Sequence, residues 1–299
     1  MTAVLYDTPG PKARLRNAGS GVVGTLLILA LLGFVVYRLA ATGQFDGSVW
    51  TWIQYQAIQV LLLRSLAATV TAFAVAALLS MLFGAVFAIG RMSDYRWINR
   101  PATVVVELFR AVPLLILIFI LYFGVSRGLG VNISTFWALV LGLMLYNGSV
   151  LAEIFRAGVN SLPRGQREAA VALGMRKTQV MLHVLLPQGL RAMLPTIVSQ
   201  LVVTLKDTAL GFLILYPELL YQARYLGSQG QLGLPILPVG MVVAALYIAM
   251  CLLLSALANY LDRRTRRSKK RVDIDPTSTA RAQNEVLVAQ SQGGGGAAI

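Results

Sequence analysis

A lysine and an aspartate, Lys206 and Asp207, stand side by side within the apolar stretch LVVTLKDTALGFLIL. They lie about 15 residues beyond Arg191, or roughly 22 Å along an ideal helix, which is too deep for side chains at a helix end. Neighbours on a helix do not face each other, so each charge needs another partner, or the helix breaks and Asp207 caps a segment from Thr208. Charges at this depth predict either a solute pathway, formed by Lys206, Asp207 and Thr208, or a structural buried pair. As a pathway they suit a zwitterion, with the lysine facing a carboxylate and the aspartate facing an ammonium group.

Four further charges lie in apolar runs as two pairs with the same spacing. Glu107 and Arg110 stand near the start of one run, and Glu153 and Arg156 stand near the end of the next. Residues three apart share a helix face, and both pairs have similar depth. They predict a crossed cluster of four charges, which is either a packing network near a gate or a set of substrate contacts.

Residues for catalysis or for a metal site are not evident in the sequence. No G-x-x-x-x-G-K-[ST] phosphate loop occurs, and Lys177-Thr178 lacks the adjacent glycine that lets backbone amides cradle phosphate. His183 is the single histidine and Cys251 the single cysteine, so neither a multi-histidine metal site nor an intrachain disulfide can form. We expect no catalytic residue, no metal and no cofactor in this chain, with His183 at a helix interface and Cys251 in packing.

The composition predicts an all-α integral membrane protein. Hydrophobic residues make up 57% of the 299 residues and charged residues only 13%, beyond the usual range of a water-soluble fold. The net charge of +14 does not indicate nucleic-acid binding, because basic residues lie between apolar runs and in the tail RRTRRSKKR rather than among aromatic residues. Six runs are long enough to span a membrane: Val22–Ala40, Ser65–Ile89, Ala102–Val125, Ser134–Leu151, Met193–Leu215 and Pro235–Ala258. The first is expected to be retained, since it is longer than a signal-peptide core and no clear cleavage site follows it.

Basic residues gather in segments that six spans place on one side of the membrane. These segments precede the first run, connect the second to the third and the fourth to the fifth, and follow the last. Lysine and arginine are held on the cytoplasmic side, so both termini are expected to be cytoplasmic. The tail, residues 263–299, lacks apolar periodicity and is expected to be a disordered anchor or linker, with anionic-lipid binding as the alternative for its basic run.

The segment EAAVALGMRKTQVMLHVLLP, Glu168–Pro187, is polar although it connects two apolar runs. Pro163 suits a first helical turn, and the alanines favour a short helix that Gly174 ends with positive φ. Thr178 is expected to cap a second helix, which Pro187 interrupts. Two short helices at a sharp angle make a protruding knob, although an amphipathic interfacial connector has the same local pattern.

This segment resembles the EAA loop of ABC importer permeases. The matching positions are Glu168-Ala169-Ala170, three residues, Gly174, nine residues, Val184, one residue and Leu186-Pro187. More narrowly, the chain resembles the polar amino-acid permease group in the segments ELFRAVPLL, LAEIFRAGV, LPRGQREAA and LKDTAL. The resemblance implies a type I ABC importer permease fold over residues 55–262 with a coupling loop at 161–187. Residues 22–40 are then an additional transmembrane helix, preceded by a cytoplasmic segment at 1–21.

The resemblance also implies partners and a function. Glu168, Ala169, Ala170 and Gly174 would couple the permease to a dimer of ATP-binding subunits, which bind ATP and Mg. A second permease chain, related but different, and an extracellular or periplasmic substrate-binding protein would complete an importer in a bacterial inner membrane, surrounded by lipid. The implied cargo is a polar amino acid, glutamate or glutamine, moved by alternating access. The alternatives are an ion-coupled secondary transporter acting through Lys206 and Asp207, and a nonconducting scaffold that uses the basic tail.

Overall fold

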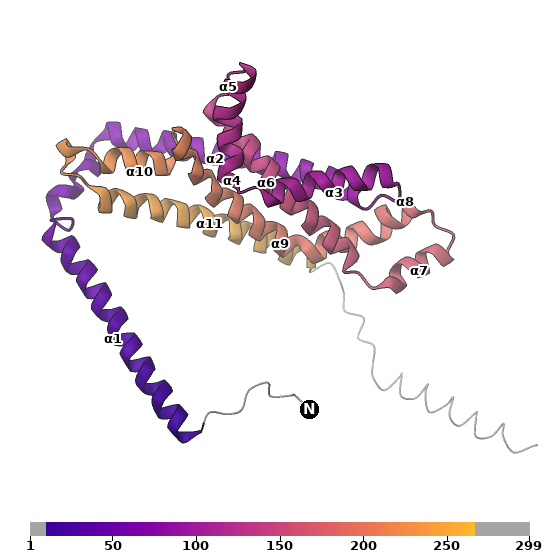
Figure 1. The fold of residues 1–299 in the computed structure, drawn as a ribbon, viewed down its shortest axis with the longest axis horizontal. Coiled ribbons are helices and arrows are strands. Elements are labelled where there is room, and N and C mark those ends of the chain that lie inside the picture. The colour runs from indigo at the N-terminus through magenta and orange to yellow at the C-terminus, as the bar shows by residue number, and fades with distance from the viewer. Residues whose placement is uncertain (1–9, 267–299) are drawn as a thin grey trace, which may run out of the picture. The chain divides into compact units, whose positions relative to one another are not determined.

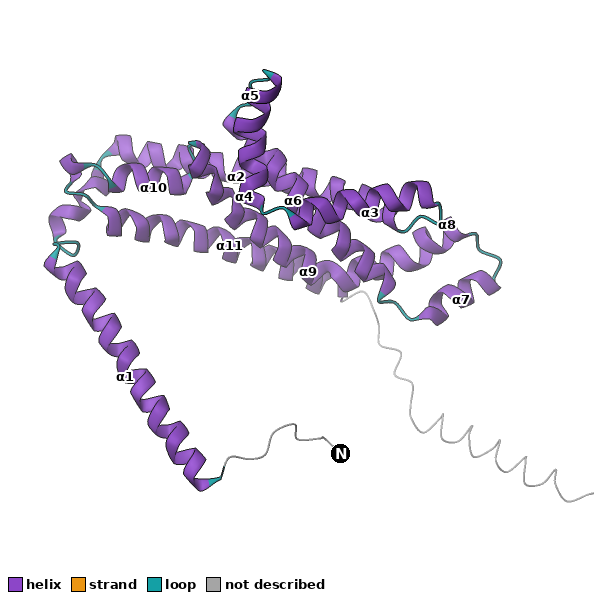
Figure 2. Cartoon of the chain, in the orientation of Figure 1, coloured by secondary structure: helices purple, strands orange, loops and turns teal. Residues whose placement is uncertain are grey.

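The computed structural model describes residues 10–266, and helices make up nearly all of this part of the chain (Figure 1). Residues 10–266 contain no strand, so the predicted all-α class is confirmed (Figure 2). The chain divides after Ala258 into two units, and the described part of the second is the end of α11. The elements are α1 (Pro11–Ala41), η1 (Gly47–Gln54), α2 (Gln56–Arg91), α3 (Arg96–Ala111), α4 (Leu114–Phe119), η2 (Ile120–Gly124), α5 (Val125–Leu129), α6 (Thr135–Asn160), α7 (Arg164–Ala172), α8 (Lys177–Gln179), η3 (Val180–Leu185), α9 (Leu186–Asp207), η4 (Thr208–Ile214), α10 (Leu219–Gly227), η5 (Gly230–Leu232) and α11 (Ile236–Arg266).

Within the described residues, five helices are long and apolar enough to cross a membrane, and a bent pair makes up to six. The third predicted span is this pair, because Arg96–Ala111 and Leu114–Leu129 meet at 99° instead of forming one straight helix. Pro113 explains the break, since a proline holds the preceding residue out of the helical region, and Val112 has the extended values φ −83° and ψ 127°. The predicted spans are therefore five continuous helices and one broken pair.

Helix α2 packs along α6 through small residues. Ala72 and Ala76 of α2 have no exposed surface and belong to the main apolar cluster. Further along the same contact, a Cβ added to Gly84 would lie 2.8 Å from the Leu151 Cβ and 3.1 Å from the Gly148 carbonyl oxygen. Small residues let membrane helices approach closely where no hydrophobic force drives them together. The two helices that position the charged residues are thus held at short range by glycine and alanine.

The helix that follows α7 runs without the interruption that its sequence predicts at Pro187. Thr178 does not cap the second helix, because the N-cap is Arg176, whose backbone N–H donates to Gln179 Oε1 at 2.8 Å. Pro187 does not interrupt the helix either, and the span continues from Lys177 to Ile214. Pro187 follows the π-helical turn η3, in which the Leu186 N–H reaches back to the Met181 carbonyl oxygen. The wider turn gives the proline ring room that an α-helical turn lacks.

Both predicted terminal segments contain helix. α1 begins at Pro11, inside the segment predicted for residues 1–21, and none of its residues is buried by the rest of this chain. α11 continues to Arg266, so residues 263–266 are helical although we predicted a disordered tail from 263. The remainder of that tail and residues 1–9 lie outside the described residues.

We predict that Gly84→Val separates α2 from α6 and destabilises the protein by about 1–3 kcal/mol, the usual range for overpacking. The purified chain in detergent should then unfold at a lower temperature, followed by intrinsic fluorescence. Gly24→Val in α1 is the matched control, because no atom lies within 4 Å of its added Cβ. Equal melting temperatures for the two variants would show that the α2–α6 contact does not require a glycine.

Candidate functional site

Asp207, at the end of α9, faces α6 through a chain of polar side chains. Asn147 Nδ2 donates to Asp207 Oδ2 at 3.3 Å, and Gln200 Nε2 donates to Asn147 Oδ1 at 2.7 Å. Asn147 has no exposed surface, whereas Asp207 and Gln200 are partly buried. The partner of the aspartate is therefore the amide of Asn147, which sequence analysis missed together with Gln200.

The structure separates the two adjacent charges. Lys206 is exposed and forms no ion pair within residues 10–266, whereas Asp207 turns towards Asn147. The alternative of a helix break is met in part, because α9 ends at Asp207 and the 3-10 helix η4 begins at Thr208, but the Asp207 side chain makes no capping hydrogen bond. Thr208 is fully buried, and its hydroxyl donates to the Leu205 carbonyl oxygen at 2.6 Å. Of the three residues predicted for a solute pathway, only Lys206 and Asp207 keep accessible polar atoms.

The predicted cluster of four charges forms around Glu153, with one further member. Arg156 Nη2 lies 2.6 Å from Glu153 Oε1, and Arg91 Nη1 lies 2.8 Å from Glu153 Oε2. Arg110 is more distant, at 3.8 Å from the same carboxylate, and Glu107 contacts Arg91 at 3.7 Å. Arg91 was missed because we counted it only among the loop charges that set orientation. Its side chain is just 9% exposed, so it is the most buried cation of the cluster.

The predicted coupling residues are divided between two sides of α7. Glu168 and Ala169 are exposed, whereas Ala170 is buried in a cluster with Val180 and Leu185. Gly174 has φ +79°, so the positive φ expected at the end of this helix is confirmed. One side of α7 therefore contacts the helix that leads to Asp207, and the other is open to a partner.

A second buried carboxyl, at Glu218, was not anticipated. It has no exposed surface and accepts hydrogen bonds from the backbone N–H groups of Leu220 at 2.7 Å and Tyr221 at 2.6 Å, and from the Tyr247 hydroxyl at 2.7 Å. Burial raises the pKa of Glu218 to about 7, because desolvation of the charged form outweighs these stabilising hydrogen bonds. An acidic residue directly before an apolar helical run is the sequence signal for such an N-cap. Glu218 connects the start of α10 to α11.

Comparison with known proteins shows the family of this chain. Residues 80–267 match the family described as "Binding-protein-dependent transport system inner membrane component". The chain belongs to this family. The chain is 38% identical over 239 residues to the glutamate transport system permease protein GluD of Corynebacterium glutamicum, covering 79% of this chain and 86% of that protein. It is 32% identical over 204 residues to the arginine transport system permease protein ArtQ of Bacillus subtilis, covering 68% and 91%.

Solved structures agree with the family assignment. The crystal structure of an amino acid ABC transporter with histidines contains a chain that is 30% identical, with a TM-score of 0.65 over 70% of this chain and 95% of that one. An inward-facing structure of the MetNI methionine ABC transporter, at 20% identity and a TM-score of 0.60, shows the same fold. The type I ABC importer permease fold and the resemblance to polar amino-acid permeases are thus confirmed, and the protein is a multi-pass permease of the amino-acid ABC transporter family.

We predict that Arg91 and Glu153 of this permease are energetically coupled. Arg91→Met or Glu153→Gln alone should destabilise the protein by about 1–3 kcal/mol, less than for a fully buried pair because the Glu153 side chain is 25% exposed. The double variant should lose less than the sum of the singles, since the Arg91–Glu153 contact is lost in both singles but can be lost only once. Thermal unfolding of the four proteins measures the coupling.

Arg110→Met is the matched control, because Arg110 lies farther from Glu153 and is 42% exposed. Its combination with Glu153→Gln should show weaker coupling. Strict additivity for both arginines would contradict a cluster centred on Glu153.

Proposed function

We propose that this chain is a transmembrane subunit of an ATP-driven importer for glutamate or glutamine. The observation that carries the proposal is the 38% identity to a glutamate permease across most of both chains, supported by 34% identity over 187 residues to a probable glutamine ABC transporter permease protein GlnP of Bacillus subtilis. The chain would work with two ATP-binding subunits, which hold ATP and Mg, a related but different second permease and an external substrate-binding protein. Its place is a bacterial inner membrane, with both termini cytoplasmic under the positive-inside rule.

In this proposal, Lys206 and Asp207 contact the substrate. Lys206 is exposed on this subunit at membrane depth, where an unpaired ammonium group is costly and a substrate carboxylate would stabilise it. Asn147 holds the Asp207 carboxylate by a single hydrogen bond, which leaves its other oxygen for a substrate ammonium group. Thr208 supports the change from α9 to η4 and does not contact substrate, because its hydroxyl is already bonded to Leu205.

Force from the ATPase would reach these residues through one helix. The exposed residues Glu168 and Ala169 dock on the ATP-binding subunit, while buried Ala170 ties α7 to Val180 and Leu185 of η3. From there the helix is continuous to Ile214 and carries Asp207 on its way. A displacement of α7 is therefore transmitted along a rigid element to the polar residues between α6 and α9, which alternating access requires.

Replacing Lys206 or Asp207 tests the substrate site. Lys206→Met and Asp207→Asn should each lower the uptake efficiency about 10- to 100-fold and change the preference among amino acids, because a hydrogen bond to a charged group is lost. Uptake is measured in vesicles holding the assembled complex and ATP, with ion gradients dissipated. The matched control is Arg38→Met, an exposed cation of α1. Unchanged kinetics and preference in both variants would refute the substrate site, and uptake that stops without an ion gradient would favour a secondary transporter.

The coupling loop is tested by Gly174→Val and Glu168→Lys. Valine strains the backbone at φ +79° and should tilt α7, while lysine reverses a charge on its exposed side. Membrane insertion should stay near normal, but the ATPase should dissociate or hydrolyse ATP without uptake, as followed by co-purification and substrate-stimulated hydrolysis in vesicles. Gly130→Val is the matched control, because Gly130 also has positive φ, +67°, and open space around it, but lies after α5. If both variants keep a bound ATPase that substrate stimulates, and take up substrate normally, the segment only connects two helices and does not couple the ATPase to transport.

A further inference from the structure

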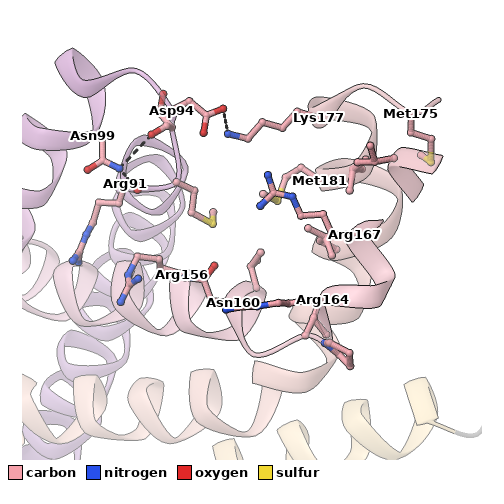
Figure 3. A pocket seen from close by; sticks show the side chains of 18 residues that line it. Arg91, Asp94, Asn99, Arg156, Asn160, Arg164, Arg167, Met175, Lys177 and Met181 are labelled. Atoms are coloured by element: carbon pink, nitrogen blue, oxygen red, sulfur yellow. Dashed lines mark hydrogen bonds and ion pairs between the residues drawn. The ribbon is translucent and has the colours of Figure 1, made fainter. Parts of the chain in front are cut away.

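A cavity of about 780 Å³ lies beside the coupling loop (Figure 3). One wall is the turn between α2 and α3, and the other is formed by the end of α6 together with α7 and η3. An ion pair between Lys177 and Asp94 connects the two walls at the edge of the cavity. Figure 3 shows the Arg167 guanidinium group directed into the space between the walls.

The charged groups that line this cavity are unbalanced. Its cations are Arg91, Arg156, Arg164, Arg167 and Lys177, and Asp94 is its single acidic residue. Arg91 and Arg156 are bound to Glu153, and Lys177 is bound to Asp94. Arg164 and Arg167 form no ion pair within residues 10–266, and Glu168, which lies beside them on α7, does not line the cavity, so the cavity presents two unpaired guanidinium groups. This charge favours an anion.

Much of the remaining lining of the cavity is apolar. Val171, which is exposed, and Met181 line it beside Val159, Val180 and Leu185, which are almost fully buried, and Met92 adds an apolar side chain from the turn between α2 and α3. A small hydrophilic anion would leave the accessible apolar side chains of Val171 and Met181 without a partner. A basic edge beside an apolar wall, at the ends of the spans α2 and α6, matches an amphiphile with an anionic head group and acyl chains.

We propose that this cavity binds an anionic phospholipid of the cytoplasmic leaflet. Arg164 and Arg167 hold the phosphate, and the glycerol and first acyl carbons lie against Val171, Met175 and Met181. Because Arg164 and Arg167 belong to α7, the bound lipid ties the coupling loop to the bilayer and makes its position dependent on lipid composition. This lipid site rests on the membrane orientation proposed above, but it does not depend on the identity of the cargo or on substrate contact at Asp207.

The test is native mass spectrometry of the purified full-length chain with phosphatidylglycerol or phosphatidylcholine of identical acyl chains. The wild type should retain phosphatidylglycerol preferentially. Arg164→Gln with Arg167→Gln should weaken this binding about 30-fold, or about five-fold for each arginine, without changing phosphatidylcholine binding. Arg96→Gln with Arg100→Gln is the matched control, because both arginines are exposed near the same turn but do not line the cavity. This control should bind phosphatidylglycerol like the wild type.

Three results would overturn the proposal. An equal loss in both double variants would mean diffuse surface attraction instead of a site. Displacement of phosphatidylglycerol by glycerol 3-phosphate or inorganic phosphate at similar concentration would assign the arginines to a soluble anion. Loss of the lipid when the ATP-binding subunits are added would assign them to an acidic segment of that partner. None of these readouts involves transport, so failure here leaves the importer proposal standing.

Discussion

An ionised side chain inside the hydrocarbon region must be stabilised by other groups, because its charge is costly there without a partner. The described part of the chain meets this constraint at Glu153 and Asp207, which lie between helices that are far apart in sequence. Glu153 binds Arg91 across the α2–α6 contact, and Asp207 accepts from Asn147 between α9 and α6. Each polar contact therefore also fixes the register of two packed helices.

The same constraint separates the two carboxylates by role. Glu153 is surrounded by arginines, so its charge is balanced within this subunit. Asp207 has only the neutral amide of Asn147, so its charge is solvated by one hydrogen bond and not neutralised. A carboxylate that is not neutralised and is only partly buried is suited to binding a cationic group reversibly. This difference supports the proposal that Asp207 contacts substrate and Glu153 does not.

Hydropathy was sufficient to locate the spans, because apolar length is a property of each segment alone. It did not show that Val112 and Pro113 break the third span, although Pro113 is visible in the sequence, since proline also occurs in continuous membrane helices. Pro187 is the opposite case, because a π turn accommodates it and the helix continues. The involvement of Arg91, Asn147 and Gln200 depends on how α2 and α9 lie against α6, and that arrangement is a tertiary property without a local sequence signal. The left-handed Gly174 was predictable because it follows from the end of a single short helix.

Lys206 lies on the exposed side of α9. Its neighbour Asp207 turns inward to α6, and successive helical residues point in different directions, so Lys206 is left on the surface of the subunit. At this depth, lipid cannot stabilise its ammonium group, and no acidic residue within residues 10–266 does so. The stabilising group must then come from outside this part of the chain, as water, substrate or a second permease. All three are present where two permease chains enclose a solute pathway. In the proposed importer, this side of α9 would therefore face the pathway, with Asp207 at its edge.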